Sequence, residues 1–572
     1  MYRLILRLLP QPGCAMLYTL PCMHRSWRLW AAAVLSAALL ELPFPLAGPL
    51  PAWRTVFAWF GLVPLLCAVL SAAVAGRPHS LRRSFLLGYL CGFLWYMGNC
   101  YWVRNTMMRY GDMPLFAPTL LLIGFSLVLG LYCGFFGLGI QLLRQASGST
   151  RLALVFAPVL WTALDLAAAR ITSVPWDQLG YSQVDNALVT QIAPWTGVYG
   201  ISFVLVAVNA LIAGGLLLEC CRGKHCPGNW LANRRVWGVS GAILLMVCGA
   251  GVTIAPPRPA PTATAVLIQP NLNVGDDNPW IGAVWGRHIA QFVNLAGEMC
   301  KGYIAGIPQT GAPRRQIPCP ENPAPPALVV WPESPAPFFQ DDPRFQQAMR
   351  WIAQAIQAPL VVGGIGTDLS PQNETWSEYN SAMIFNSKGK MVGRYDKIHL
   401  VPFGEYVPFA KLLSFAHKLT GRVGKFDRGT LRNAFLVDGR RYGIFICYED
   451  VFGAEVRQFA RNGAEVFVNI SDDGWYGDTS APWQHLNMAR MRAIENRRWL
   501  LRDTNNGVTA VIDPYGRVRE SIPRHKVDAL PAEFAYSDKM TFYTEHGDVF
   551  AWLCALLSLG TAGWAGSKLL AG

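Results

Sequence analysis

The chain has 572 residues, too many for one compact domain, which predicts at least two structural units. Apolar residues make up 52% and charged residues only 15%, against about 25% charged in soluble domains, so the composition excludes an ordinary soluble protein. The net charge is +13, but region 256–548 holds 31 basic and 30 acidic residues and the rest of the chain 18 and 6. The excess of basic residues therefore lies among the apolar segments, which argues against a basic nucleic-acid-binding face on a folded domain.

Eight long apolar stretches predict membrane-spanning helices, since each approaches or exceeds the ~20 residues that cross a bilayer. Seven of them precede residue 256 and one follows residue 548. They are residues 29–46, 56–75, 85–103, 118–143, 152–169, 198–218, 236–254 and 549–570. The predicted organisation is an N-terminal extension (1–28), seven spans (29–255), a soluble domain (256–548) and an eighth span with a short tail (549–572).

The basic residues of the short loops predict the orientation of these spans. With the N-terminus in the cytoplasm, the inside loops hold thirteen Lys and Arg residues and the short outside loops hold four. Seven crossings then place region 256–548 outside the cytoplasm, which in a bacterium is the periplasm. Both termini would be cytoplasmic, and the chain would lie in the inner membrane.

The soluble region alternates short Val- and Ile-rich runs with helical patterns, which is typical of a layered α/β domain. Predicted strands are residues 265–269, 327–331, 360–364, 442–447, 464–470 and 508–512. Predicted helices are residues 345–357, 453–462 and 483–497. Turn signals at Ser387-Lys-Gly389 and Pro514-Tyr-Gly516 indicate hairpins.

The soluble region contains three cysteines, Cys300, Cys319 and Cys447. In an oxidising compartment Cys300 and Cys319 can pair, and the sequence leaves open whether they do. Cys447 would then be unpaired. A free thiol is often an inert core residue, so its interpretation depends on the residues around it.

Three motifs lie at or just after the C-terminal ends of strands, where open α/β sheets form their ligand crevice. They are Trp331-Pro-Glu333-Ser, Lys397-Ile-His-Leu-Val-Pro-Phe-Gly-Glu405 and Ile446-Cys447-Tyr-Glu449. Together they supply a thiol nucleophile, a carboxylate base and a fixed cation. A thiol with a pKa near 8.5 needs such a base or cation to attack at neutral pH.

We assign Glu333 as the general base, because a carboxylate can take the thiol proton and return it to the leaving group. Lys397 would stabilise the tetrahedral oxyanion, an interaction that is typically worth about 3–4 kcal/mol. The backbone N–H of Tyr448 would be the second donor to that oxyanion.

The order of these motifs resembles the Glu–Lys–Cys set of the nitrilase superfamily. The spans around them, with Pro482-Trp-Gln-His485 and Thr504-Asn-Asn-Gly-Val-Thr509, narrow the resemblance to the apolipoprotein N-acyltransferases. It implies a four-layer αββα sandwich on eight membrane helices. It also implies a ping-pong reaction, in which Cys447 takes an acyl chain from a phospholipid, typically phosphatidylethanolamine. The acceptor would be the α-amino group of an S-diacylglyceryl cysteine at a lipoprotein N-terminus.

The resemblance further implies that Glu405 and Glu449 support the site, and that a Trp after the first strand contacts substrate. That Trp is Trp280, although the loop is longer here and Trp285 is an alternative. The segment 405–426 is apolar, aromatic and Gly-containing, as expected of a lid. Further substrate-binding candidates are His399, Phe403, Tyr406, Trp475 and Trp483. No metal or organic cofactor is expected.

Two other functions were weighed against the acyltransferase. A membrane-tethered amidase or nitrilase would use the same three residues to hydrolyse a small C–N bond, but it would not need eight spans. A transporter with a degenerate soluble domain would carry more charge inside its spans than Glu41 and Asp165.

Overall fold

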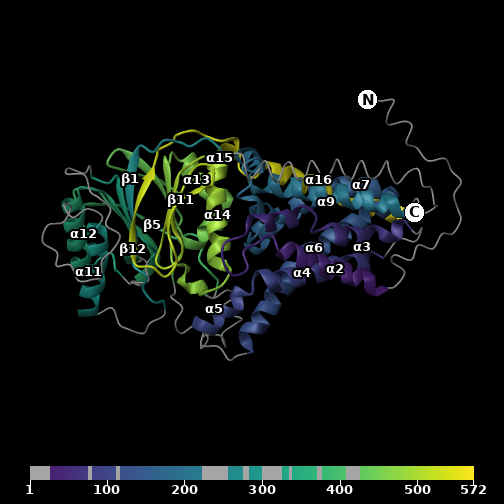
Figure 1. The fold of residues 1–572 in the computed structure, drawn as a ribbon, viewed down its shortest axis with the longest axis horizontal. Coiled ribbons are helices and arrows are strands. Elements are labelled where there is room, and N and C mark those ends of the chain that lie inside the picture. The colour runs from purple at the N-terminus through teal and green to yellow at the C-terminus, as the bar shows by residue number, and fades with distance from the viewer. Residues whose placement is uncertain are drawn as a thin grey trace.

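The chain forms two units, a helical bundle and an α/β sandwich, that lie end to end along the long axis of the molecule (Figure 1). The structure is a computed structural model. It describes residues 26–74, 80–110, 116–221, 256–274, 283–298, 325–333, 338–369, 376–402, 404–406 and 426–571.

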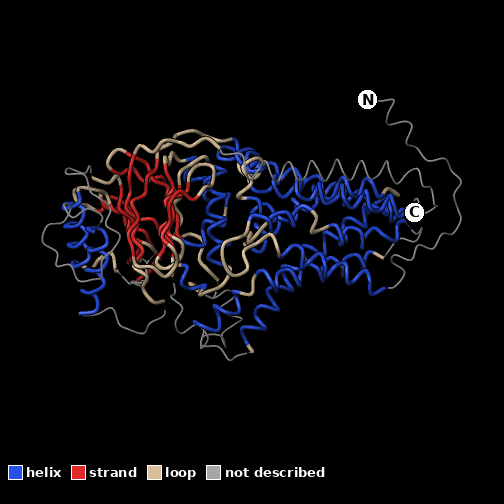
Figure 2. The backbone as a smooth tube through the Cα atoms, in the orientation of Figure 1, coloured by secondary structure: helices blue, strands red, loops and turns tan. Residues whose placement is uncertain are grey.

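The bundle contains long apolar helices from the first 221 residues and one from the C-terminus, which packs back against α6 and α7 (Figures 1 and 2). These helices are α2 (Ser26–Glu41), α3 (Val63–Val74), α4 (Leu81–Asn99), α6 (Ala117–Ser147), α7 (Thr150–Ala167), α9 (Val198–Cys221) and α16 (Val549–Ala571). The shorter α5 (Trp102–Tyr110) and α8 (Ala193–Thr196) lie toward the sandwich end of the bundle.

Within the described part of the chain, five helical segments are long and apolar enough to cross a membrane: residues 52–71, 117–147, 150–172, 198–217 and 549–570. They match five of the eight predicted spans. The first predicted span is α2, whose 16 residues rise only about 24 Å at ~1.5 Å per residue, short of the ~30 Å hydrocarbon layer. The third is α4, which is 19 residues long but too polar to qualify. The seventh (236–254) lies outside the described residues, so the structure supports a membrane protein without establishing eight spans.

Two six-stranded sheets form the centre of the sandwich. The first has the order β12-β1-β2-β3-β4-β5 and the second the order β11-β10-β9-β8-β7-β6. The first contains β1 (Ala263–Gln269), β2 (Leu328–Trp331), β3 (Leu360–Leu369), β4 (Trp376–Phe385), β5 (Met391–Asp396) and β12 (Asp528–Phe534). The second contains β6 (Ala434–Val437), β7 (Arg440–Ile446), β8 (Val466–Ser471), β9 (Leu500–Thr504), β10 (Thr509–Ile512) and β11 (Val518–Ile522).

Helices cover the outer faces of both sheets, giving the four αββα layers that the resemblance implied. Helices α11 (Ala283–Glu298) and α12 (Pro343–Ile356) cover the first sheet at the end far from the bundle (Figure 1). Helices α13 (Gly453–Arg461) and α14 (Ala481–Asn496) cover the second sheet and lie between it and the bundle. In each sheet, β1-β2-β3 and β7-β8-β9 are parallel, as alternating strands and helices predict.

All six predicted strands and all three predicted helices occur, each within a few residues of its predicted bounds, except that β3 runs on to Leu369. Ser387-Lys-Gly389 joins β4 to β5 and Pro514-Tyr-Gly516 joins β10 to β11, both as antiparallel hairpins. The two turn signals implied β4, β5 and β11 without giving their bounds, and the sequence did not predict β6, β9, β12 or α11.

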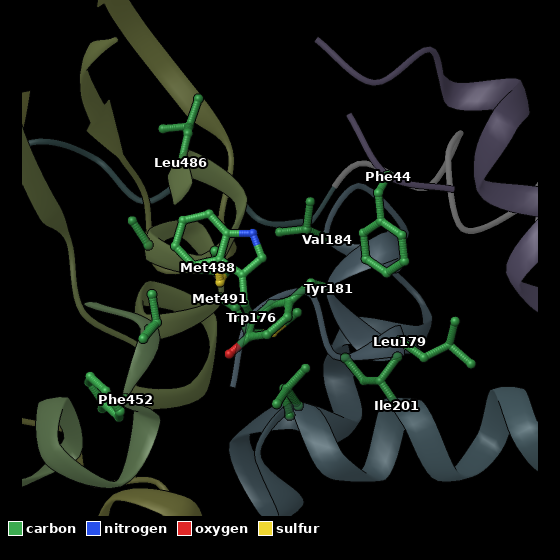
Figure 3. Packing of buried hydrophobic residues seen from close by; sticks show 14 of the residues in the cluster. Phe44, Trp176, Leu179, Tyr181, Val184, Ile201, Phe452, Leu486, Met488 and Met491 are labelled. Carbon is green, nitrogen blue, oxygen red and sulfur yellow. The ribbon is translucent and has the colours of Figure 1, made fainter. Parts of the chain in front are cut away.

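Helix α14 docks the sandwich on the bundle through buried polar contacts as well as apolar packing. Gln484 on α14 accepts a hydrogen bond from Trp176 Nε1 (2.9 Å) and donates one to Asn99 Oδ1 (2.9 Å). Figure 3 shows Trp176 lying among side chains of both units, including Met488 and Tyr181. Because one apolar cluster runs through both units, they share a core.

Candidate active site

Cys447 occupies a strained turn at the end of a buried strand. Strand β7 ends at Ile446, and residues Cys447–Val451 form a 3-10 turn. Cys447 has a φ of 50°, a left-handed conformation that is uncommon for a residue with a side chain. Its exposed fraction is only 5%. Backbone strain of this kind clusters at functional sites.

The first sheet contributes a buried cation held between two carboxylates. Lys397, which follows β5, has no exposed side-chain area; its Nζ lies 3.0 Å from Glu333 Oε1 and 2.9 Å from Glu405 Oε1. Asn380 on β4 donates to the same two oxygens, at 2.7 and 2.6 Å. The other oxygen of Glu333 accepts the backbone N–H of Asp472 at 2.9 Å. These hydrogen bonds fix both carboxylates against the ammonium group.

The charges of this group reach the thiol of Cys447. Burial by itself would lower the pKa of Lys397, but the carboxylates of Glu333 and Glu405 raise that pKa well above its usual value. Burial raises the pKa of Cys447; the negative charge of Glu333 raises it further, and Lys397 opposes this. The resting site is therefore a neutral thiol beside a charged lysine and a carboxylate, so the thiol needs a base to become a nucleophile.

Glu449 connects the two sheets at the site. Its Oε1 accepts the backbone N–H groups of Ile398 (2.7 Å) and His399 (3.1 Å), just after Lys397. Its Oε2 accepts the backbone N–H of Ile446 (2.7 Å), just before Cys447. Burial raises the pKa of Glu449, while these N–H groups lower it. Glu449 thus holds the lysine loop and the cysteine turn in register without reaching the thiol through a hydrogen bond.

A fully buried charge network lies on the other side of the cysteine turn. His485 Nε2 lies 2.9 Å from Asp450 Oδ1 and 3.3 Å from the backbone oxygen of Cys447. Its Nδ1 lies 3.0 Å from Asp473 Oδ1, and Arg502 bridges Asp450 (2.9 Å) and Asp473 (3.1 Å). Burial by itself would lower the pKa of His485, but the charge of Asp450 and the hydrogen bonds to Asp450 and Asp473 together raise it. The network anchors the backbone of the nucleophile turn.

The remaining predicted site residues that the structure describes contact other parts of the sandwich and the bundle. Tyr448 donates its hydroxyl to the Ser173 backbone oxygen in the bundle (3.0 Å), and His399 stacks on Phe452. Tyr406 is half-buried beneath Arg428, Trp475 is 44% exposed beside Tyr110, and Trp483 packs against the core. Trp280, Phe403, Cys300, Cys319 and lid residues 407–425 lie outside the described residues.

Trp285, the alternative to Trp280, packs in the outer apolar cluster under α12, against Phe338 and beneath Arg344. A residue enclosed there serves the packing of the α11–α12 layer.

Sequence reasoning missed Asn380 and the network of Asp450, Asp473, His485 and Arg502. Asp472 and Asp473 follow an apolar strand directly, so the strand-end rule that identified Glu333 could have found them. His485 belongs to the Pro482-Trp-Gln-His485 motif, which supported the family resemblance but not a role for the histidine. Asn380 and Arg502 gave no signal, because both lie on strands whose bounds were not predicted.

Comparison with known proteins places these motifs in a family. A family model of the apolipoprotein N-acyltransferase N-terminal domain matches residues 36–211, and a carbon-nitrogen hydrolase model matches residues 317–530. The apolipoprotein N-acyltransferase of Geobacter metallireducens is 34% identical over 540 residues, covering 92% of this chain and 93% of that protein. The one from Ralstonia nicotianae is 31% identical, covering 90% and 92%.

Among solved structures, a nitrilase-superfamily protein of Saccharomyces cerevisiae is 18% identical, with a TM-score of 0.34, covering 49% of this chain and 93% of its own. A carbon-nitrogen hydrolase of Helicobacter pylori is 17% identical, with a TM-score of 0.33, covering 50% and 92%.

Proposed function

This chain belongs to the apolipoprotein N-acyltransferase family, and on that premise we propose that it acylates lipoproteins through a thioester on Cys447. The family and the acyltransferase class predicted from the motifs are confirmed by these relatives. The observation that carries the proposal for the site is the Lys397 ammonium, buried between Glu333 and Glu405 and electrostatically coupled to Cys447.

In the first half-reaction, Glu333 takes the proton of the Cys447 thiol as the sulfur attacks an ester carbonyl of a glycerophospholipid, phosphatidylethanolamine in our proposal. A C–S bond forms and the ester C–O bond breaks. The proton passes from Glu333 to the departing glycerol oxygen, giving a lysophospholipid and an S-acyl enzyme. The raised pKa of Cys447 supports this order, because the resting thiol keeps its proton until a base removes it.

In the second half-reaction, the α-amino group of an N-terminal S-diacylglyceryl cysteine attacks the thioester carbonyl. Glu333 removes a proton from the attacking nitrogen, the C–N bond forms, and the C–S bond breaks. The proton returns to the sulfur, so the free thiol is restored and no net charge is left behind.

Both tetrahedral intermediates carry an oxyanion, for which Lys397 Nζ and the backbone N–H of Tyr448 are the proposed donors. Glu405 and Asn380 act as positioning residues, since they hold Lys397 and Glu333 at fixed distances. Glu449 positions the Cys447 turn relative to the lysine loop.

We further propose that His399, Phe403, Tyr406, Trp280, Trp475 and Trp483 contact the two lipid substrates. Trp475 has the strongest support, because a large apolar ring that is 44% exposed beside α5 is available to an acyl chain. The domain limits, the eight spans, the inner-membrane location and the periplasmic sandwich remain part of this proposal, supported by five apolar helical segments and the loop charges.

The proposal is tested by incubating the purified protein with phosphatidylethanolamine and no acceptor. We expect the Cys447 peptide to gain the mass of one fatty acid minus water, with one lysophospholipid released per enzyme. Cys447→Ala should give neither product while keeping its melting temperature, and Cys554→Ala, which changes a thiol in α16, should behave as the parent. Steady lysophospholipid release without a stable acyl peptide would instead indicate that water hydrolyses the thioester, and no lysophospholipid at all would favour the membrane-tethered amidase.

A further inference from the structure

A cavity of about 180 Å³ lies where the sandwich meets the outer ends of the bundle helices. Its walls include Arg170, Tyr199, His399, Glu455, Arg492 and Asp548. Glu333, Lys397, Glu405 and Cys447 are absent from the described residues that line it. The cavity is therefore separate from the thiol, although its lining includes Val451, the last residue of the Cys447 turn, and Phe452, which follows it.

Three candidate spans each have one end at this cavity. Arg170 lies at the end of the apolar segment 150–172, Val198 begins the segment 198–217, and Asp548 directly precedes the segment 549–570. The cavity thus lies at the boundary between apolar helix surfaces and the polar sandwich. In a bilayer, that boundary is the depth of the phospholipid head groups.

The helix surface beside the cavity is suited to acyl chains. Helix α16 packs against α7, yet only 17% of its apolar segment is buried, against 44–61% for the other four segments. Ile171 at the cavity edge is 77% exposed, and Leu553 on α16 is 54% exposed. A lipid with its head in the cavity could therefore lay its chains along α16 and α7.

The walls of the cavity carry both signs of charge. Arg170 Nη2 lies 2.6 Å from Asp548 Oδ2, and 40% of its side chain remains exposed. Arg492 is almost fully buried; its Nη2 pairs with Glu495 (3.1 Å), while its Nε has no hydrogen-bond partner among the described residues. Glu455, which forms an ion pair with Arg432, also lines the cavity. Guanidinium groups bind phosphate, whereas carboxylates and aromatic rings such as Tyr199 bind an ammonium group.

The size of the cavity restricts the occupant. About 180 Å³ holds roughly six water molecules at ~30 Å³ each, too little for a whole lipid or a folded peptide. A purely anionic head would meet Asp548 and Glu455, and a simple cation would meet Arg170 and Arg492. A small zwitterionic group that carries one phosphate and one ammonium can pair with both the guanidinium and the carboxylate groups of the lining, including the Arg170–Asp548 pair.

We propose that this cavity binds the phosphoethanolamine head of a second phospholipid that is not the acyl donor. The bound head joins the ends of three spans to the sandwich and supports the Cys447 turn through Val451 and Phe452. This goes beyond the acyl-transfer proposal, since it needs only that the chain lies in a membrane.

The test uses a phosphoethanolamine lipid with two ether-linked chains and a photoreactive group in the head. An ether lipid has no ester bond and cannot acylate Cys447, so binding is measured apart from turnover. After irradiation of the full-length protein in detergent, we expect crosslinks to residues 169–175 and 541–549. An excess of unlabelled ether phosphoethanolamine lipid should compete, whereas the phosphoglycerol analogue and free phosphoethanolamine should compete poorly.

Arg170→Gln should lower the crosslinking yield roughly tenfold, as expected for the loss of one charge-assisted hydrogen bond. Arg151→Gln, at the opposite and exposed end of the same apolar segment 150–172, is the matched control and should leave the yield unchanged. Arg170→Lys keeps the ion pair with Asp548 and should retain part of the yield if Arg170→Gln fails to fold. Equal yields in Arg170→Gln and Arg151→Gln would overturn the proposal, as would crosslinks confined to the Cys447 site or competition by a diacylglyceryl peptide alone.

Discussion

At the scale of single residues, the protonation state of Cys447 determines how the site begins its reaction. Its pKa is raised by burial first and then by the charge of Glu333, with Lys397 acting against both. A preformed thiolate–lysine pair would require that Lys397 lower the pKa of Cys447 by more than burial and Glu333 raise it. The carboxylate therefore raises the pKa of the resting thiol, and in the proposed mechanism it is also the base that accepts the thiol proton when substrate arrives.

The pH dependence of thiol alkylation tests this balance. Because the pKa of Cys447 is raised, we expect its alkylation by iodoacetamide to keep increasing above pH 9, past the value near 8.5 of an ordinary thiol. Glu333→Gln removes the neighbouring negative charge and should shift the profile to lower pH, while reducing acyl-enzyme formation by about 10²–10⁴-fold. Mass spectrometry of the Cys447 peptide measures both. A plateau below pH 8 in the parent would contradict the neutral resting thiol.

Asp472 gives a second titration prediction, on stability. Burial first, and then the charge of Glu333, raise the pKa of Asp472 to about 8, against about 3.9 in the unfolded chain. Between these two values the folded state keeps a proton that the unfolded state has lost. Asp472 therefore lowers stability as pH rises from about 4 to 8, by up to about 1.4 kcal/mol per pH unit.

Asp472→Asn cannot ionise, so we expect its melting temperature in detergent to fall less than that of the parent between pH 5 and pH 8. Asp478→Asn, at an exposed position nearby, controls for the loss of a carboxylate at the surface. Parallel pH profiles for the parent and Asp472→Asn would contradict the raised pKa.

The catalytic candidates could be predicted from the sequence because each stands next to a strand end in a short motif. Glu333, Lys397 and Cys447 are far apart in the chain, but the strand-end rule brings them to one edge of the sandwich. Asn380 could not be found this way. It lies inside β4, where the pattern changes from alternating exposure to full burial along the strand, and a strand of that kind has no simple periodicity.

At the scale of elements, α14 connects the chemistry to the bundle. One face of the helix carries His485 to the Cys447 turn, while neighbouring Gln484 faces the bundle. The pattern of the sequence predicted this helix, but it did not predict that the helix is buried on nearly all sides. Arg, Asn, Gln and His residues are typical of a solvent-exposed helix face, and here they are buried. Their partners lie on other elements, which a single sequence does not reveal.

Gln484→Leu tests this docking. The substitution keeps the size of the side chain but leaves the buried Nε1–H of Trp176 without its acceptor, which typically costs about 1–3 kcal/mol. We expect a lower melting temperature in detergent and a slower acylation step, because α14 also carries His485. Gln458→Leu on the half-buried face of α13 is the matched control, and an equal effect there would show that the Trp176 contact is unimportant.

At the scale of the whole molecule, the sandwich and the bundle form one body and not two tethered domains. Their apolar residues belong to one cluster, and the ion pair between Arg170 and Asp548 joins the end of one span to the start of another. The chain therefore holds the Cys447 turn at a fixed height above the bundle. Sequence reasoning predicted both units, but the contacts that join them depend on residue pairs hundreds of positions apart.

The orientation of this body in the membrane decides which substrates can reach Cys447, and the loop charges predict it. Thirteen Lys and Arg residues lie in the predicted inside loops against four in the short outside loops, which places the sandwich outside the cytoplasm. Lys526→Cys adds a thiol at an exposed position of the sandwich, and Arg151→Cys adds one at an exposed inner end of α7. Each is compared with the parent chain, whose native cysteines set the background of labelling.

In cells with a permeabilised outer membrane, we expect a membrane-impermeant maleimide to label Lys526→Cys at once and Arg151→Cys only after the inner membrane is broken. The reverse pattern would place the thiol of Cys447 in the cytoplasm. An exported lipoprotein presents its N-terminal amine on the outer surface of the membrane, so that result would remove the acceptor from reach of the thioester.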